Sequence, residues 1–292
     1  MGSTPTPTPP RAPRRAPSPH VSVLPLLASS HPGPTVVVTA VALVLGIGVR
    51  LPPTPLALLV LVVLAGQLSI GWSNDWLDAA RDTAVHRSDK PVATGGVRAA
   101  TVRTAAFVAA TASVLLSLLL GPAAAAVNLA CFGMGWVYNL GVKATLASIA
   151  PYLVCFGLLP ALATLSLAPP RLPAAWIVAA GALLGAAAHL TNVLPDLEDD
   201  RATGIRGLPH VIGARASGVL AFLALAAAAS LVAFGPAGPP APVTLAGLAI
   251  GVAIAVLGVA LTVTRRPTRL LMRLIMAGAV VDVAMLAIAQ LG

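Results

Sequence analysis

Charged residues are scarce in this sequence. They make up 9% of its 292 residues, against roughly 25% in an average soluble domain. Hydrophobic residues make up 58%, which is more than a soluble core of this length requires. These two values exclude an ordinary soluble protein and predict an integral membrane protein, in which apolar runs of about 20 residues cross a hydrocarbon layer about 30 Å thick.

Cysteine is also rare, and the few cations form no continuous basic face. Cys131 and Cys155 both lie inside apolar runs, where a thiol is usually a small buried hydrophobic group. The absence of a CxxC pair, and of any Cys/His spacing suited to zinc, excludes a structural zinc site. The net charge of +9 comes from cations spaced between apolar runs, so it does not indicate a nucleic-acid partner.

What the sequence does contain is a series of apolar segments behind a Pro- and Arg-rich tail. We expect residues 1–24 to form a disordered tail and residues 25–292 to form one transmembrane domain. The apolar segments lie at 35–50, 55–73, 99–120, 122–139, 147–166, 172–194, 217–235, 241–263 and 270–291. Pro, Gly or charged residues separate them. The sequence therefore predicts an all-α polytopic membrane protein with nine transmembrane helices.

Lys and Arg are distributed unequally between the connecting segments. When the tail is placed in the cytoplasm and nine helices are threaded through the membrane, only Arg50 and Arg171 of the 18 cations fall outside. Cytoplasmic loops of membrane proteins carry such an excess of cations. We therefore expect the N-terminus on the cytoplasmic side and the C-terminus outside.

The nine acidic residues are gathered even more tightly. The first cluster follows the second apolar segment, and the second cluster follows the sixth, on the same expected side of the membrane. The clusters consist of Asp75, Asp78, Asp82 and Asp89, and of Asp196, Glu198, Asp199 and Asp200. Only Asp282 lies elsewhere. Their separation by four helices also suggests a duplicated four-helix unit followed by a ninth helix.

Both clusters contain the pattern Asn-x-x-x-Asp-x-x-x-Asp, in "NDWLDAARD" at 74–82 and in "NVLPDLEDD" at 192–200. On a helix, residues at this spacing share one face. Like charges there destabilise a helix, especially at its C-terminal end, and a bound cation removes that penalty. Oxygen ligands without His or Cys favour Mg²⁺, which readily shares its shell with substrate phosphates. The candidate ligands are Asp75, Asp78, Asp82, Asp196, Asp199 and Asp200. Solvated loop caps at a membrane surface are the alternative.

Several other polar residues fall near the two clusters. Lys90, Arg201 and Arg206 would offset the charge of a diphosphate, or would only anchor the loops at the membrane surface. Tyr138, Asn139 and Lys143 lie at the end of the fourth segment on the same side, and a bend is needed if Tyr138 and Lys143 are to face one site. Alternatively, they are an interfacial tyrosine and a lysine that reaches to the membrane surface. Inside the apolar segments, His189 and Asp282 are either functional or packing residues.

These motifs resemble those of the UbiA superfamily of intramembrane prenyltransferases. "NDWLDAARD" resembles the first motif of that family, NDxxDxxxD, and "DLEDD" at 196–200 resembles the second, DxxxD. "YNLGVK" at 138–143 resembles the Tyr/Lys segment after the fourth helix, and "RATGIRGLPHVIG" is also family-like. The resemblance covers about residues 25–290.

The resemblance implies a nine-helix bundle around a central cavity that opens to lipid. Two or more Mg²⁺ ions would bridge the carboxylates and an isoprenoid diphosphate. It implies catalytic roles for Asp75, Asp78, Asp82, Asp196, Asp200, Lys143 and Tyr138. It implies a diphosphate-binding group of Asn74, Asn192, Asn139, Lys90, Arg201 and Arg206.

Two positions depart from the family pattern. Ala28 stands where many members carry Arg before a Pro, and Gly207 stands where Ser or Thr commonly precedes "LP". Both differences concern the acceptor rather than the metal. Outside the cytoplasmic loops, the expected membrane core contains no Lys or Arg to pair with a carboxylate, so the sequence favours a neutral lipophilic acceptor or none.

Three functions fit these residues. Ionisation of the diphosphate would leave an allylic carbocation, which is attacked either by a nucleophilic carbon of an acceptor, often an aromatic one in this family, or by the substrate's own double bonds. The first outcome is prenyl transfer and the second is terpene cyclisation of a farnesyl, geranylgeranyl or geranylfarnesyl diphosphate. A cation-coupled transporter is the third reading, but its acids should lie near the membrane midplane, whereas these lie at helix ends.

Overall fold

The computed structural model describes residues 23–202, 204–266 and 268–291. These residues form helices and short turns, with no strand among them. The nine longest helices are α2 (Pro32–Gly48), α3 (Pro53–Leu77), α5 (Ala99–Leu118), α6 (Pro122–Leu140), α7 (Ala150–Leu165), α8 (Ala175–Asn192), α11 (Ala214–Phe234), α12 (Pro242–Thr264) and α13 (Arg269–Leu291). Each of them coincides with one predicted apolar segment, which confirms the all-α class.

Eight of these helices are long and apolar enough to cross a membrane. The ninth, Pro32–Gly48, has 17 residues and falls short of that length, whereas α7 reaches it together with the adjoining turn, over Leu146–Leu165. The expected count of nine crossings is therefore not confirmed by length and composition. The tail expected over residues 1–24 lies almost entirely outside the described residues.

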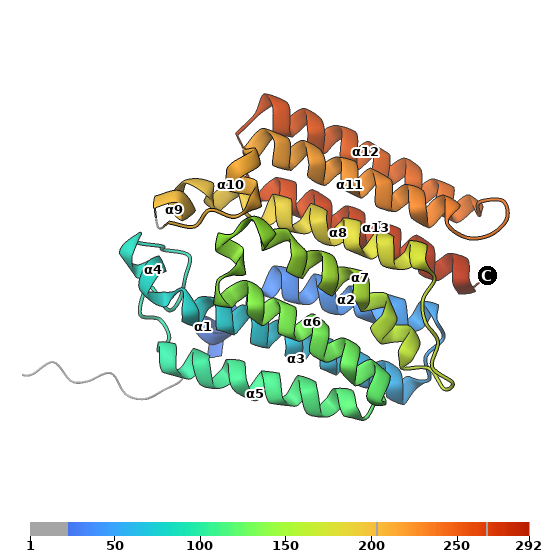
Figure 1. Cartoon of the computed structure of the whole chain (residues 1–292), viewed down its shortest axis with the longest axis horizontal. Coiled ribbons are helices and arrows are strands. Elements are labelled where there is room, and N and C mark those ends of the chain that lie inside the picture. The colour runs from blue at the N-terminus through green and yellow to red at the C-terminus, as the bar shows by residue number, and fades with distance from the viewer. Residues whose placement is uncertain (1–22, 203, 267, 292) are drawn as a thin grey trace, which may run out of the picture.

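Short helices gather at one end of the bundle, and the C-terminus lies at the other end (Figure 1). They are α1 (Val23–Ala28), α4 (Ala79–Ala84), η1 (Val142–Ala144), η2 (Leu146–Ile149), η3 (Leu194–Asp196), α9 (Leu197–Ala202) and α10 (Leu208–Ile212). Both acidic clusters belong to this end. The prediction that they lie on one side of the bundle is confirmed.

Proline starts several of the long helices. Pro32, Pro53, Pro122 and Pro242 are each the first residue of their helix, where the missing N–H has no intrahelical partner in any case. The apolar segments were separated by Pro and Gly in the sequence, so these residues account for the agreement between predicted and observed boundaries.

The helices pack as a closed arrangement around an interior space. α3 packs against α5 and α6, α7 against α8, and α8 against α11, while α13 contacts both α2 and α8. α7 and α8 approach each other closely at Gly185 because glycine has no side chain. A Cβ at this position would collide with the carbonyl oxygen of Tyr152. Small residues allow such backbone approach between membrane helices, and here the approach brings Tyr152 against the inner face of α8.

Candidate functional site

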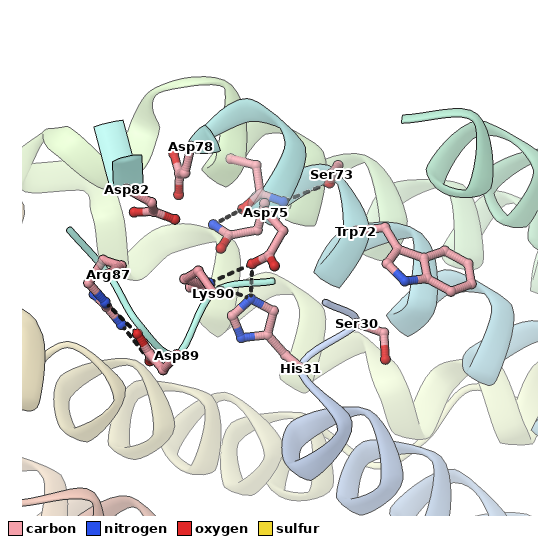
Figure 2. A network of polar contacts seen from close by, with 12 residues as sticks. Ser30, His31, Trp72, Ser73, Asp75, Asp78, Asp82, Arg87, Asp89 and Lys90 are labelled. Atoms are coloured by element: carbon pink, nitrogen blue, oxygen red, sulfur yellow. Dashed lines mark hydrogen bonds and ion pairs between the residues drawn. The ribbon is translucent and has the colours of Figure 1, made fainter. Parts of the chain in front are cut away.

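The first acidic motif spans a helix break. α3 ends at Leu77 and α4 begins at Ala79, yet the Asp78 N–H still donates to the Asn74 carbonyl (2.9 Å). The Asp82 N–H likewise donates to the Asp78 carbonyl (2.8 Å). Despite the break, the residues keep the expected helical spacing. Asp75, Asp78 and Asp82 are only 1%, 6% and 3% exposed, so three carboxylates are buried at this end of the bundle (Figure 2).

The second motif does not lie on one helix, and that expectation was wrong. α8 ends at Asn192, a 3₁₀ turn carries Asp196, and α9 carries Asp200. The physical reason is Pro195, which lacks the N–H that a continuing helix needs. The side chain of Asp199 lies outside the described part of the structure.

A cavity of about 960 Å³, the main cavity, brings the two motifs together. The motif residues that line it are Asn74, Asp75, Asp78, Asp82, Asn192, Asp196 and Asp200. Away from these groups, apolar residues of α2 and α13 such as Val41 and Ile275 line its wall. The main cavity therefore combines an acidic end with a hydrocarbon-lined interior.

Two lysines reach the carboxylates of the first motif. Lys143 Nζ lies 2.5 and 2.6 Å from the two carboxylate oxygens of Asp78. Lys90 Nζ lies 2.6 Å from Asp75 Oδ1 (Figure 2). The bend needed to bring Lys143 here occurs at Gly141, whose φ of 149° is a conformation that favours glycine.

An arginine connects the loop after the first motif with the second motif. Arg87 Nη1 lies 3.3 Å from Asp196 Oδ1, and the same guanidinium donates to Asp89 (Figure 2). Asp89 also accepts from Arg269 at the start of α13, at 2.9 Å. This chain of ion pairs joins the loop after α4 to the second motif and to the last helix.

Burial changes the pKa of several groups at the acidic end. Burial raises the pKa of Asp200 to about 6 and also raises the pKa of Asp82, against the opposing effect of Lys90. Burial lowers the pKa of Lys143 in spite of its contact with Asp78. Asp82 and Asp200 thus lose more solvation than the nearby cations restore, which favours the binding of additional positive charge.

The donor set fits Mg²⁺ only when the ion shares its shell with another ligand. Among the described residues, no three His, Cys, Asp or Glu side chains are grouped closely enough to hold a metal ion by themselves. Asp75 Oδ2 is buried without a hydrogen-bond partner in this part of the chain, so one oxygen is available. Mg²⁺ typically takes one or two carboxylates and completes its shell with water and substrate phosphate.

Two further residues of the predicted site, Tyr138 and Asn139, lie near the end of α6. Tyr138 and Asn139 line the main cavity, but the Asn139 amide nitrogen donates to Ile70 O (2.9 Å) and Ser73 Oγ (2.8 Å). Its oxygen accepts from Asn74 (3.3 Å). Asn139 therefore holds α6 against α3 and orients Asn74.

Two predicted cations point elsewhere. Arg201 and Arg206 are exposed and are not among the lining residues of the main cavity. Arg201 instead donates to the His210 carbonyl at 3.3 Å. Arg87, which lies in the loop between the first motif and Lys90, contacts the second motif in their place.

Sequence reasoning missed two lining residues. His31 Nε2 lies 3.1 Å from Asp75 Oδ1 and 3.0 Å from Lys90 Nζ (Figure 2). Tyr152 packs edge-on against Tyr138, with ring centroids 5.4 Å apart, and its ring is stacked on Phe156 at 6.2 Å. The only sequence signal for His31 was that a titratable residue lies at the start of an apolar segment. No feature of the sequence pointed to Tyr152.

The two titratable residues inside the apolar segments, His189 and Asp282, differ in whether they line the main cavity. His189 lines the main cavity, its ring lies 4.9 Å from that of Tyr152, and its Nε2 lies 3.1 Å from Ser148 Oγ. Asp282 is buried in α13 and does not line the cavity. Neither of its carboxylate oxygens has a partner among the described residues.

Comparison with known proteins gives one family and several solved structures of similar fold. Residues 35–277 match the UbiA prenyltransferase family. A UbiA homolog from Archaeoglobus fulgidus bound to GPP and Mg²⁺ is 15% identical, with a TM-score of 0.68 over 91% of this chain and 99% of that one. The apo structure of a UbiA homolog from Aeropyrum pernix K1 is 15% identical, with a TM-score of 0.71 over 88% and 98%. No curated protein matches the chain.

Proposed function

The chain belongs to the UbiA prenyltransferase family, and from that premise we propose that it is a Mg²⁺-dependent intramembrane enzyme that ionises an isoprenoid diphosphate. It transfers the prenyl group to a neutral lipophilic acceptor. The observation that carries the proposal is the convergence of both acidic motifs, Lys143 and Lys90 on one cavity with an apolar interior. Fold neighbours bound to GPP or to DMAPP, each with Mg²⁺, support it.

The acidic end of the main cavity holds the diphosphate in this proposal. Bound Mg²⁺ supplies charge that stabilises the diphosphate as it leaves. Lys143, Lys90 and Arg87 add fixed positive charge around it. The bond between C1 of the prenyl group and the diphosphate oxygen breaks, and both electrons leave with the diphosphate.

Aromatic rings line the cavity where the allylic cation forms. Tyr138, Tyr152 and Phe156 all belong to this wall, and aromatic faces attract cations, most strongly in a site without water. C1 then bonds to a nucleophilic carbon of the acceptor, which loses a proton. The apolar residues of α2 and α13 accommodate the rest of the prenyl chain.

The same aromatic wall also fits a second function. A terpene cyclase requires cation-stabilising rings around a folded chain, and the stacked Tyr152 and Phe156 satisfy this requirement without any acceptor. In that case the substrate's own double bond attacks the cation. Both functions use the same acidic end of the cavity.

Binding measurements test the diphosphate site directly. Because no three of the described carboxylates are grouped closely enough to hold a metal by themselves, Mg²⁺ and the diphosphate should bind cooperatively. We expect purified protein to bind geranyl diphosphate at least tenfold more tightly with Mg²⁺ than with EDTA, and Asp78→Ala or Asp196→Ala to abolish the difference. Full Mg²⁺-dependent turnover of either variant, correctly inserted in the membrane, would refute the two-motif site.

Product analysis separates the two functions. The protein is incubated with Mg²⁺ and geranyl, farnesyl, geranylgeranyl or geranylfarnesyl diphosphate, first alone and then with an aromatic acceptor. A cyclic hydrocarbon or alcohol from the first incubation identifies a cyclase. Turnover only after addition of the acceptor identifies prenyl transfer.

The topology is part of the proposal. We place the short-helix end of the bundle and the N-terminus in the cytoplasm, because the loops at that end carry most of the Lys and Arg. Labelling of single cysteines introduced at Arg98 and Arg171 in intact cells tests this orientation. Only the second should react with an impermeant reagent.

A further inference from the structure

His31 lies at the acidic end of the main cavity, in the link between α1 and α2 (residues 29–31). Its φ of 54° belongs to the left-handed region, which residues other than glycine seldom adopt. Pro32 follows directly, and a proline favours an extended conformation in the residue before it. A backbone conformation this unfavourable persists only where the surrounding contacts maintain it.

Contacts with α3 hold α1 and the link in place beside the first motif. Trp72 Nε1 donates to the Leu26 carbonyl at 2.8 Å, and a Cβ at Gly71 would collide with the Ser30 carbonyl oxygen. Gly71 and Trp72 precede Asp75 by about one helical turn. The contacts therefore place the residue that follows Ser30, which is His31, next to the Asp75 carboxylate.

The His31 imidazole, the Asp75 carboxylate and the Lys90 ammonium form a triangle (Figure 2). Lys90 Nζ lies 2.6 Å from Asp75 Oδ1 and 3.0 Å from His31 Nε2, and His31 Nε2 lies 3.1 Å from Asp75 Oδ1. An ammonium can only donate hydrogen bonds, so its contact with Nε2 is favourable when Nε2 offers a lone pair. Lys90 then has two acceptors, one on α3 and one in the link before α2.

Two acceptors orient the Lys90 ammonium better than one. With a single acceptor, an ammonium rotates about that one hydrogen bond, and its other N–H groups have no fixed direction. With Asp75 and His31 both bound, the third N–H of Lys90 keeps one direction. This third N–H has no partner among the described residues, and Lys90 lines the main cavity. It is therefore available to an oxygen of a bound diphosphate.

The contribution of His31 increases when Asp75 also serves a metal. Asp75 Oδ2 has no hydrogen-bond partner in the described part of the chain, whereas Oδ1 contacts Lys90. A metal ion at Oδ2 shares the delocalised charge of the carboxylate, so Oδ1 attracts the ammonium less strongly. The Nε2 lone pair of His31 remains free for Lys90 in that state.

We propose that His31 is a positioning residue that keeps Lys90 directed at the diphosphate while Asp75 serves the metal. His31 acts through Lys90 and does not itself contact the diphosphate. The left-handed backbone of His31 then has a reason, because it belongs to the arrangement that sets Nε2 3.0 Å from Lys90 Nζ. This inference rests on the proposed function.

Two substitutions of similar length test the proposal. Gln has an acceptor oxygen as many bonds beyond Cβ as Nε2 of histidine, whereas Met has a methyl group there. Binding of 2,3-dihydrogeranyl diphosphate, which lacks the allylic double bond and so does not ionise, is measured with Mg²⁺ and protein in lipid nanodiscs. We expect His31→Met to bind it about tenfold more weakly than the wild type, the effect of one hydrogen bond to a charged group. His31→Gln should stay within about threefold of the wild type.

A double-mutant cycle shows whether the effect passes through the lysine. In a Lys90→Met background, His31→Met should weaken binding by less than about twofold more, because the ammonium that it positions is absent. Without Mg²⁺, the melting temperature of His31→Met should stay within about 2 °C of the wild type, because Lys90 still pairs with Asp75. The loss of affinity is then not a loss of folding.

His86→Met is the matched control and should bind the analogue as the wild type does. His86 also has a φ of 54° and lines the main cavity, but its side chain forms no hydrogen bond with the described residues. Wild-type binding by His31→Met, or an equal loss in the Lys90→Met background, would overturn the positioning role. So would a His31→Gln variant that binds as weakly as His31→Met. If the wild type binds the analogue no more tightly with Mg²⁺ than with EDTA, the diphosphate site itself is contradicted, and this inference with it.

Discussion

Lys143 Nζ contacts both carboxylate oxygens of Asp78, at 2.5 and 2.6 Å, across 65 residues of sequence. Both side chains are buried, with 11% and 9% exposed. The contact joins the turn after α6 to the end of α3 at the acidic end of the main cavity. Under the proposed function, bound Mg²⁺ and diphosphate would give each partner a new counter-ion, the diphosphate for Lys143 and the metal for Asp78.

The first prediction separates the structural and catalytic roles of this pair. Lys143→Met leaves the buried Asp78 carboxylate with Arg81, whose Nη2 lies 2.9 Å from Asp78 Oδ2, as an ion-pair partner. We expect a loss of about 1–3 kcal/mol in stability, because a buried charge loses compensation. Turnover should fall about 100-fold or more, because a cation at the leaving group is lost. Thermal unfolding in detergent and a product assay measure the two effects.

The double variant Asp78→Asn/Lys143→Met is the control. It removes both charges together, so its melting temperature should return toward that of the wild type while turnover stays lost. A double variant that is as unstable as Lys143→Met alone would show that charge compensation is not what the pair contributes.

The second prediction concerns which arginine serves the site. Arg87 bonds to Asp196 at 3.3 Å and lines the main cavity, whereas Arg206 is exposed and does not. Arg87→Gln should raise the KM for the prenyl diphosphate about tenfold, because one charge-assisted hydrogen bond is lost. Arg206→Gln, which makes the same charge change outside the cavity, should alter it less than about twofold. Equal effects would mean that only the net charge of the surface matters.

The third prediction uses the titration of Asp200. Burial raises its pKa to about 6, from the usual value of 3.8 for an aspartate. The folded protein therefore binds this proton more tightly than the unfolded chain, and the contribution to stability is lost as pH rises from about 4 to 6. Asp200→Asn should be more stable than the wild type above about pH 6, and the two should converge below about pH 4. Melting temperatures across this range measure the difference, and parallel curves would contradict it.

The sequence predicted the helices well because hydrophobic composition determines them. Each of the nine apolar segments became one helix, and Pro or Gly marked their ends. It also predicted the meeting of the two acidic motifs, because an even number of helices between them returns the chain to the same end. Composition and helix parity are global properties, and both can be read without knowing how the side chains pack.

The rest of the site depends on packing and on side-chain direction. Tyr152 reaches the cavity only because α7 and α8 approach closely at Gly185, a contact between segments that spacing does not reveal. Arg87 and Arg206 have similar surroundings in the sequence, but the path of each loop directs one toward the cavity and the other outward. Pro195 accounts for the break in the second motif. The repeated Asn and Asp spacing is typical of one face of a helix, so spacing alone does not reveal this break.

The last prediction concerns Gly207, where the resemblance to the family pattern leads to the expectation of Ser or Thr. A Cβ at this position would lie 2.6 Å from the Lys143 carbonyl oxygen and 2.9 Å from Ser148 Oγ, closer than real Cβ contacts allow. Gly207→Ser should therefore displace the backbone that carries Lys143, lowering stability by about 1–3 kcal/mol and reducing turnover with it. Gly133→Ala on α6, where a Cβ meets nothing within 4 Å, is the matched control and should be neutral or slightly stabilising. If Gly207→Ser unfolds at the wild-type temperature and turns over normally, the close approach to Lys143 does not constrain this position, and glycine there reflects the acceptor instead.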